Sequence, residues 1–404
     1  MGVKYVDFVK EKIVIDTSVL MENIEIDDLV NKYQLTIPYV VIEELDKLKN
    51  INEKSYNARR AIRLIEKNAD KIIFVSMGIS KTNNDDIVIE CAKYYECALA
   101  TNDLNMKLKC KGFGIPIFEI DNKKDNYKGY KELVNNAENS KVLATIYADK
   151  TDNVLGLNIN EYLLIKDENG NLIDRMKYTK AGLANFNNKK INSNAIGKIK
   201  PLDGYQSCLI DSLFTNKMTM VKGKAGSGKS LISLAYALNV IEGGKYDRLI
   251  VFCNPINSRC SAKLGFFPGT KDEKLLMSLV GNMLSAKLGG IDGVYQLIDS
   301  NKLQLLPFSD LRGFDSTGSK SIVYISEAQN LTIDLLKLGI QRVGEDCKLI
   351  IDGDNNSQVD MAAYEGNNNG MRRVSEVFRG QEFYGEVELK NIYRSRMAKI
   401  ADLM

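Results

Sequence analysis

The sequence predicts an α/β protein in which a parallel sheet lies toward each end of the chain and a small β-rich module lies between them. Three observations lead to this fold class. Short β-branched runs alternate with longer mixed segments over residues 12–122, the same rhythm returns from about residue 197, and the stretch between contains strands with turn signals. At 404 residues the chain is too long for one ordinary hydrophobic core. We therefore predict three segments, with bounds 1–125, 126–196 and 197–404.

The N-terminal segment consists of apolar runs that predict a parallel sheet with helices on both faces. A charged stretch with helical spacing covers residues 46–70, and the polar residues 122–140 predict an exit helix or a linker. In chain order the apolar runs are KIVIDT, LTIPYVVIEEL, KIIFVS, DDIVIECAKYYE, CALATND and IPIFEI.

The middle segment predicts a small β-rich module. The stretches KVLATIYAD, EYLLIKDENGNLIDRMKYT and KIKPLDG are typical of strands, and the second contains a hairpin turn at Glu168–Asn171. The intervening NFNNKKINSNAIG predicts a loop.

The composition excludes several classes of chemistry. The sequence contains no histidine, which excludes Ser-His-Asp and Cys-His hydrolysis and most zinc sites. Its seven cysteines form no C-x-x-C pair, so reduced thiols are favoured over a disulfide framework. The net charge of +3 is nearly balanced, so any nucleic-acid contact must come from local patches. The start, MGVKYVDFVKEK, lacks a signal-peptide core and no segment approaches a membrane span, so we expect a cytoplasmic protein.

The strongest motif is a phosphate-binding loop. An apolar strand at 218–221 leads into G-x-x-x-x-G-K-S and then into an apolar helix, which is the context that this motif requires. Glycines let backbone N–H groups converge on phosphate oxygens, Lys229 should reach the β and γ phosphates, and the Ser230 hydroxyl should bind Mg²⁺. The predicted loop residues are Gly223, Lys224, Ala225, Gly226, Ser227, Gly228, Lys229 and Ser230. Upstream, Gln206 is a candidate for contacting adenine through its amide, although a surface glutamine is an equally good interpretation.

Carboxylates form a second pattern in the N-terminal segment. Acidic residues stand at strand ends and helix starts, which meet at one edge of a parallel sheet. Such acids would repel one another unless a hard cation such as Mg²⁺ or Mn²⁺ neutralised them, and that site could cleave a phosphodiester without histidine. Each acid alone is also typical of a helix cap or a solvated charge. The four candidates are Asp16, Glu44, Asp86 and Asp103, with Glu43 and Asp85 as the neighbours of the two central ones.

Residues 197–404 resemble the PhoH family of P-loop ATPases, which are related to superfamily 1 helicases. The stretches that carry the resemblance are IKPLDGYQ, VKGKAGSGKSLISLAYALN, LGFFPGTKDEKL, SEAQNLT, DGDNNSQVD, NNGMRRVSEVFRG and IYRSRMAKIADL. The resemblance implies a RecA-like domain with a parallel sheet, in which Glu327 polarises the attacking water and Asp354 and Gln358 sense the γ-phosphate. It also implies that Arg394, or failing that Arg396, completes a neighbouring subunit's site in a ring such as a hexamer.

Residues 12–122 resemble the PIN-domain nucleases in the stretches VIDTSVLM, IPYVVIEELDKLK, NNDDIVIECAKYYE and LATNDLNMKLKCKGFGIP. This resemblance implies a helix-flanked parallel sheet and metal-dependent ribonuclease chemistry through the four acids. It favours Glu44 because Leu45 follows it and Asp86 because it lies six residues before Ala92. Thr101 and Asn105 are candidates for supporting the metal ligands.

The chain departs from the PhoH pattern at three places. Ser326 replaces the usual aspartate that holds Mg²⁺ through water, CNPINS at 253–258 replaces an Arg-Pro segment, and Asp352 precedes the Gly353–Asp354 pair. Family topology places the KLIIDGD strand between the phosphate-loop strand and the IVYIS strand. One hypothesis is therefore that Asp352 partly replaces the missing acid, and the alternative is an aspartate that only stabilises a turn.

Two functions are weighed from the sequence, and a third, an active ATPase with a degenerate PIN scaffold, is disfavoured because all four acids are present. The first is an enzyme that couples ATP hydrolysis, with RNA unwinding or translocation, to cleavage of single-stranded RNA by the PIN site. The second is a nucleotide-gated RNA clamp with little or no ATPase activity, which Ser326 favours. Both require ATP and Mg²⁺ or Mn²⁺, and Phe266 and Phe267 are candidates for stacking on bases or for core packing.

Overall fold

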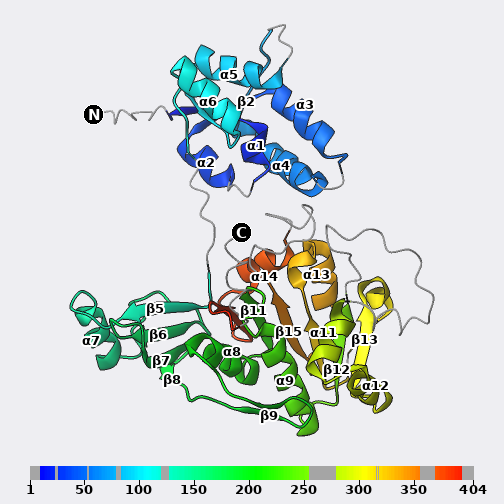
Figure 1. Cartoon of the computed structure of the whole chain (residues 1–404). Coiled ribbons are helices and arrows are strands. Elements are labelled where there is room, and N and C mark those ends of the chain that lie inside the picture. Colours follow the sequence, from blue (N-terminus) through cyan, green and yellow to red (C-terminus); the bar gives the residue numbers. More distant parts are fainter. Residues whose placement is uncertain are drawn as a thin grey trace, which may run out of the picture. The chain divides into compact units, whose positions relative to one another are not determined.

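The computed structural model describes residues 10–22, 26–51, 54–78, 83–119, 127–253, 279–314, 316, 318–354 and 369–393. The chain divides into two compact units, of which the first ends at residue 126 and the second begins at residue 127 (Figure 1). Across these described ranges, no helix combines the length and the apolar character that crossing a bilayer requires.

The first unit contains a four-stranded parallel sheet in the order β3-β2-β1-β4. The central strand β1 places Val14 opposite Thr36 of β2 and opposite Leu99 of β4. Its side chains are apolar on both faces because helices cover both, as the sequence predicts. The strands are β1 (Lys12–Ile15), β2 (Gln34–Pro38), β3 (Ile72–Val75) and β4 (Ala98–Ala100).

Two runs in this unit fold differently from a continuous strand. LTIPYVVIEEL forms a strand only as far as Pro38, and helix α3 then buries Val41 and Leu45, which lie one turn apart. DDIVIECAKYYE lies in helix α5, because its buried positions follow a helical rather than an alternating pattern. Within the described part of IPIFEI, only Ile117 bridges to β4. The helices are α1 (Thr17–Leu20), α2 (Ile26–Lys32), α3 (Tyr39–Leu48), α4 (Ser55–Lys67), α5 (Asn84–Tyr94) and α6 (Leu104–Phe113).

The second unit contains a six-stranded parallel sheet in the order β13-β12-β14-β15-β11-β16. Strand β15 lies between β14 and the phosphate-loop strand β11, as the sequence analysis expects. The strands are β11 (Met218–Gly223), β12 (Arg248–Cys253), β13 (Leu303–Pro307), β14 (Ser321–Ile325), β15 (Lys348–Gly353) and β16 (Tyr384–Leu389).

Alternate side chains of this sheet belong to two different cores. On β14 and β15, Tyr324 and Ile350 pack in the core that includes helix α9, whereas Ile325 and Ile351 pack in the opposite core with helices α13 and α14. Because side chains alternate along a strand, Ser326 and Asp352, which lie two positions after Tyr324 and Ile350, point to the α9 face of the sheet. The helices are α8 (Gly204–Thr215), α9 (Lys229–Glu242), α11 (Leu279–Lys287), α12 (Ile291–Asp299), α13 (Ile333–Ile340) and α14 (Gly370–Phe378).

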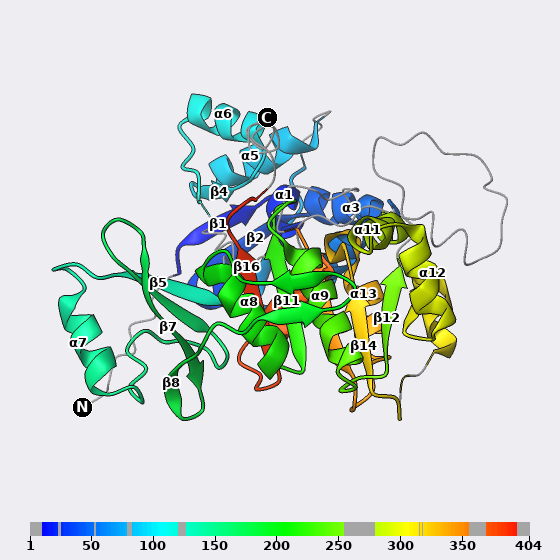
Figure 2. The ribbon, with the colours of Figure 1, turned by 60° about the horizontal axis from the view of Figure 1, so that its bottom comes forward.

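A smaller sheet, in the order β5-β6-β7-β8, lies to one side of the large sheet within the second unit (Figure 2). The predicted hairpin is confirmed, because β6 and β7 pair antiparallel around a turn in which Gly170 has φ of 85°. The strands of this sheet are β5 (Tyr130–Val134), β6 (Tyr162–Lys166), β7 (Leu172–Thr179) and β8 (Gly182–Asn185). Two further strands, β9 (Ile191–Ser193) and β10 (Gly197–Ile199), form a separate two-stranded sheet.

Three expectations for this region are wrong. KVLATIYAD forms helix α7 (Ser140–Ala148), which buries Leu143 and Ile146 three residues apart. The polar stretch 122–140 contains strand β5, which pairs parallel with the buried strand β6 and adds Tyr130 to the core. The predicted loop contains β9, which pairs with β10 in a short antiparallel ribbon.

Candidate functional site

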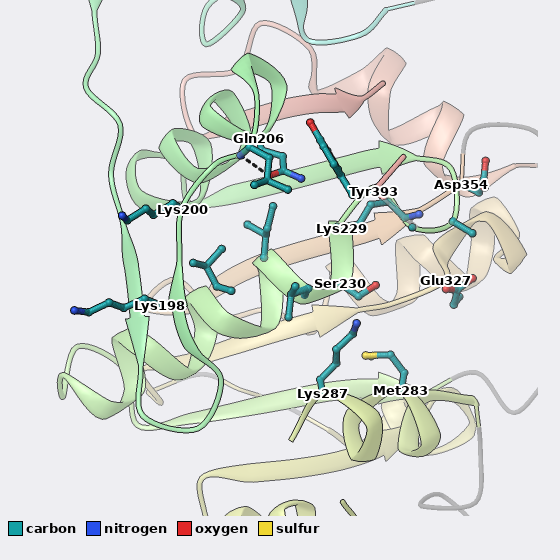
Figure 3. A pocket seen from close by; sticks show the side chains of 17 residues that line it. Lys198, Lys200, Gln206, Lys229, Ser230, Met283, Lys287, Glu327, Asp354 and Tyr393 are labelled. Atoms are coloured by element: carbon teal, nitrogen blue, oxygen red, sulfur yellow. Dashed lines mark hydrogen bonds between the residues drawn. The ribbon is translucent and has the colours of Figure 1, made fainter. Parts of the chain in front are cut away.

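A pocket of about 790 Å³ lies around the phosphate loop, at the carboxyl end of β11 (Figure 3). Gln206 and Tyr393 lie on one side of it, and Met283 and Lys287 of α11 lie on the opposite side. This volume lies within the range of pockets that hold small-molecule ligands. The predicted residues that line it are Gln206, Ala225, Gly226, Gly228, Lys229, Ser230, Glu327 and Asp354. Lys198 and Lys200, at and just after β10, also line the pocket and are not among the predicted residues.

The loop has the backbone geometry that a phosphate-binding turn needs. Gly226 and Gly228 have φ of 85° and 99°, which residues with a Cβ rarely adopt. The Lys229 ammonium is buried and donates to the carbonyl oxygens of Gly223 and Lys224. These two hydrogen bonds hold the Lys229 ammonium at the phosphate loop. A bound phosphate would replace the two carbonyl oxygens as its acceptor.

Gln206 is bonded to the protein through both ends of its amide. Its Oε1 accepts from Leu202 N at 2.9 Å, and its Nε2 donates to Ser227 O at 3.1 Å. The side chain is 4% exposed. Gln206 therefore holds the phosphate loop to the segment before α8, and both ends of the amide that the sequence suggests for an adenine contact are bonded to the backbone.

Tyr393 ties the end of the described chain to the same loop. Its N–H donates to Gly226 O at 3.0 Å, and its hydroxyl donates to Asp203 Oδ2 at 2.6 Å. Asp203 in turn caps helix α8 by accepting from Gln206 N at 2.7 Å. Partial burial and the Asp203 carboxylate raise the pKa of Tyr393 to about 12, so the hydroxyl remains a donor. Sequence reasoning missed this tyrosine, although it stands directly before Arg394 in IYRSR.

Ser230 meets an acidic residue on a neighbouring strand. Its Oγ donates to Asp352 Oδ2 at 2.7 Å. The same oxygen accepts from the Tyr324 hydroxyl at 2.5 Å, and Asp352 Oδ1 accepts from Glu327 N at 3.1 Å. Asp352 is 0% exposed and Ser326 is 4% exposed. Asp352 is therefore in direct contact with the hydroxyl that should bind Mg²⁺, which is what the hypothesis that Asp352 partly replaces the missing acid requires.

Glu327 occupies a strained backbone position at the pocket. It has φ of 55°, which is uncommon for a residue other than glycine and is often found at functional sites. Desolvation by the surrounding protein and the nearby Asp352 carboxylate raise the pKa of Glu327 above its ordinary value. A carboxylate with a raised pKa is better suited to accept a proton from water near neutral pH.

Gln329 links the two acidic strand ends. Its Nε2 donates to Glu327 Oε2 at 2.6 Å, and its Oε1 accepts from Asp354 N at 3.0 Å. The predicted sensor Asp354 is therefore placed beside Glu327 through one buried amide. Gln358, Arg394, Arg396, Phe266, Phe267 and most of CNPINS lie outside the described residues.

In the first unit, Asp16 lies at the carboxyl end of β1 as predicted. Its Oδ2 accepts from Thr101 Oγ1 at 2.9 Å, from Ser18 Oγ at 2.5 Å and from Ser18 N at 3.3 Å. Asp103 caps helix α6, accepting through Oδ1 from the backbone N–H of Asn105 at 2.7 Å. Thr101 also accepts from Asp103 N at 3.1 Å, so this threonine connects the two acids.

Glu44 rather than Glu43 faces this network. The Thr17 hydroxyl, next to Asp16, donates to Glu44 Oε2 at 2.8 Å. Glu43 is exposed and lines a separate shallow groove on α3. The preference for Glu44 in the sequence analysis therefore agrees with the contacts.

The preference for Asp86 does not agree with them. Asp86 forms an ion pair with Lys109 at 2.8 Å, whereas the pKa of Asp85 is raised by burial and then by Asp16, with Asp103 adding to the effect. The Asp16 and Asp103 carboxylates thus act on Asp85, and this makes Asp85 the better candidate for the site, since Asp86 is paired with Lys109. Successive residues of a helix point about 100° apart, so the two neighbouring aspartates of α5 have different surroundings.

The carboxylates are near one another but are not drawn into a tight cluster. Over the described parts of the chain, no three acidic or cysteine side chains come close enough to share one metal ion. Carboxylates without a cation between them repel, and this repulsion favours separation. Their oxygen atoms remain the donor type that Mg²⁺ and Mn²⁺ prefer.

Comparison with known proteins gives one family match for each of the two domains. Residues 198–403 match the family described as PhoH-like protein, and residues 13–121 match the family described as PIN domain. Protein PhoH2 of Bacillus subtilis (strain 168) is 26% identical over 444 residues, which cover 96% of this chain and 98% of that protein. Protein PhoH2 of Thermobispora bispora is 21% identical over 427 residues, covering 97% and 95%. Among solved structures, Pif1 helicase from Candida albicans covers 51% of this chain and 43% of its own, with 14% identity and a TM-score of 0.27.

The fold and the two sites define a PIN domain followed by a P-loop nucleotide-binding domain. The chain belongs to the PhoH-like protein family, and its full-length relatives share the fusion of the two domains. Both resemblances drawn from the sequence are therefore confirmed. Together the domains support nucleotide hydrolysis and an RNA-related nuclease role in general terms.

Proposed function

We propose that this protein hydrolyses ATP and uses the hydrolysis to move single-stranded RNA into a PIN ribonuclease site. The observation that carries the ATPase part is the presence of Lys229, Ser230 and Glu327 in one pocket. These residues supply the phosphate contact, the metal-binding hydroxyl and the candidate base for water. A protein that only holds a nucleotide has no need for a strained glutamate with a raised pKa beside the loop.

The proposed division of work follows from the contacts. Lys229 would exchange its two carbonyl partners for phosphate oxygens, while the loop N–H groups surround the β-phosphate. Glu327 would accept the proton of the attacking water, with Gln329 fixing its carboxylate. Mg²⁺, held through Ser230, would neutralise charge that develops on the phosphate oxygens. Arg394 of a neighbouring subunit in a homo-oligomeric ring, such as a hexamer, would complete the site.

In the PIN domain, Asp16, Glu44, Asp85 and Asp103 would hold Mg²⁺ or Mn²⁺. The hydrogen bonds to Asp16 all reach Oδ2, so the protein orients this carboxylate through one oxygen and leaves the other for a ligand. The metal would generate hydroxide for attack on the RNA phosphodiester, which this chain must achieve without histidine. We place this activity in the cytoplasm.

The alternative is a nucleotide-gated RNA clamp with an independent nuclease. Ser326 favours this alternative, because it removes a charge from the strand that ordinarily carries the magnesium-holding acid. The contact between Asp352 and Ser230 opposes it, because a carboxylate is still present at the metal-binding hydroxyl.

Two assays on the full chain test the proposal. Mg²⁺-dependent ATP hydrolysis is measured with and without single-stranded RNA, with Lys229→Ala as the blank, and turnover above the blank that rises with RNA is expected. Cleavage of a labelled single-stranded RNA is then measured with and without ATP, with Asp16→Asn as the nuclease blank. Cleavage that ATP does not stimulate would contradict coupling, and absence of turnover with tight nucleotide binding would support the clamp.

A further inference from the structure

We propose that the acid that holds magnesium has moved from strand β14 to strand β15, so that Asp352 does the work that Ser326 cannot. This inference rests on the proposed nucleotide function and names the residue that gives the same pocket its magnesium dependence.

The sheet register places the two residues side by side. Ile325 of β14 lies opposite Ile351 of β15, and Ser326 and Asp352 each follow by one residue. Since Tyr324 and Ile350 face α9, Ser326 and Asp352 project toward the same helix. The first turn of α9 carries Ser230, so an acid on either strand end can reach it.

The hydrogen bonds define what Asp352 does to Ser230. A serine hydroxyl has one hydrogen and two lone pairs. Because the hydrogen is donated to Asp352 Oδ2 at 2.7 Å, the lone pairs of Ser230 are left to face a cation. Asp352 is thus a positioning residue that acts through Ser230, in the way that outer partners orient metal ligands elsewhere.

The buried carboxylate of Asp352 forms no ion pair with any lysine or arginine among the described residues. Asp352 is 0% exposed, so its carboxylate is also shielded from solvent. Its hydrogen bonds come from the Tyr324 hydroxyl, the Ser230 hydroxyl and the Glu327 N–H, none of which carries a positive charge. Burial of a carboxylate without a counter-charge is costly, and a bound divalent cation would relieve that cost.

The same contacts explain why Ser326 is not an aspartate. An acid at 326 would stand beside Asp352 and next to Glu327, and three neighbouring carboxylates would raise one another's pKa values. Ser326 and Asp352 should therefore behave as a pair. An aspartate at 326 should help only when the one at 352 has been removed.

Magnesium dependence of nucleotide binding tests this pairing without relying on turnover. Binding of a fluorescent ATP analogue by the full chain is titrated with Mg²⁺ and repeated in EDTA. Asp352→Asn should raise the half-saturating Mg²⁺ concentration about 10- to 100-fold while binding in EDTA changes less than about twofold. Asp334→Asn, on an exposed position of α13, is the matched control and should change neither quantity.

The reciprocal swap Ser326→Asp with Asp352→Ser should restore the Mg²⁺ requirement to within about threefold of the native protein, whereas Ser326→Asp alone should not improve it. An unchanged Mg²⁺ requirement in Asp352→Asn would overturn the inference. If Asp352→Asn does not fold, the swap decides, because its failure to bind Mg²⁺-nucleotide like the native protein would overturn the inference as well. Native protein that binds Mg²⁺-nucleotide without hydrolysing it would contradict the proposed ATPase but leave this inference standing.

Discussion

Gln329 Nε2 donates a hydrogen bond of 2.6 Å to Glu327 Oε2, and the other end of the same amide accepts from the backbone N–H of Asp354. Gln329 is 1% exposed, so this bridge is rigidly packed. It connects Glu327, which follows β14, to Asp354, which follows β15, so one side chain holds both acidic residues of the pocket. The bridge thus fixes the orientation of the carboxylate on which the proposed hydrolysis depends.

Glu327→Gln should leave nucleotide binding within about threefold of the native value but lower ATP turnover at least about 100-fold, because the amide cannot accept the proton. Turnover and fluorescent-nucleotide binding measured on the same samples check this. Glu168→Gln, at an exposed position of the turn between β6 and β7, is the control. Equal loss of binding and turnover would mean that Glu327 holds the nucleotide instead.

The pH profile of turnover follows from the raised pKa of Glu327. The carboxylate must be ionised to act as base, so activity should fall as pH drops through its folded-state pKa, which lies above the ordinary glutamate value of 4.5. Steady-state rates at saturating ATP between pH 4.5 and 8 measure this limb. A limb at or below 4.5 would contradict the assignment.

Gln206→Ala should weaken binding of ATP and GTP by the same factor, roughly five- to tenfold, because its amide is bonded to the backbone of Leu202 and Ser227. Competition of both nucleotides against one fluorescent probe gives the two affinities. Gln296→Ala, at an exposed position of α12, is the control. Selective loss of ATP binding would show that Gln206 contacts adenine.

Asp85→Asn should lower RNA cleavage about 10- to 100-fold, whereas Asp86→Asn should lower it less than about threefold. The Asp16 carboxylate raises the pKa of Asp85, whereas the Asp86 carboxylate forms an ion pair with Lys109. Cleavage of a labelled single-stranded RNA at saturating Mn²⁺ ranks the two variants, which serve as controls for each other. The opposite ranking would restore Asp86 as the metal ligand.

Lys348 offers a test of stability. It is 2% exposed, its ammonium donates to Asn216 O, and burial together with Lys245 and Lys177 lowers its pKa to about 7. The unfolded chain keeps this proton to about pH 10, so it binds more protons than the folded chain above pH 7. The free energy of unfolding of the second unit should therefore rise with pH, by at most about 1.4 kcal/mol per unit from this group.

Lys348→Met should remove that rise, which urea unfolding at pH 7.0 and 8.0 measures while most thiols and phenols remain protonated. Lys337→Met, at an exposed position of α13, should leave the pH dependence unchanged. Parallel profiles of the native protein and Lys348→Met would show that Lys348 stays charged in the folded protein.

Strand and helix boundaries show where sequence patterns are insufficient. KVLATIYAD is rich in apolar and β-branched residues, but it buries one helical face because Leu143 and Ile146 pack with Leu163 and Met176 of β6 and β7. Strand β5 lies in a stretch that is mostly polar, and it forms because β6 offers a partner edge. In both cases tertiary contacts outweigh local preference.

The sequence by itself determined the phosphate loop and the two domain types. Gly226, Gly228, Lys229 and Ser230 are contiguous, and their chemistry depends on local backbone geometry that glycine permits. It also determined the acidic chemistry of the PIN domain, since no histidine is present to replace the carboxylates.

Only the tertiary structure decided which acids act together. Ser230 and Asp352 are separated by 122 positions and meet because β15 inserts between β11 and β14. Asp85 and Asp86 are adjacent in sequence and are distinguished by their surroundings, because Asp86 pairs with Lys109 whereas burial and Asp16 raise the pKa of Asp85. Strand order and helix rotation are properties of the packed chain, and they set the distances on which electrostatic interaction depends.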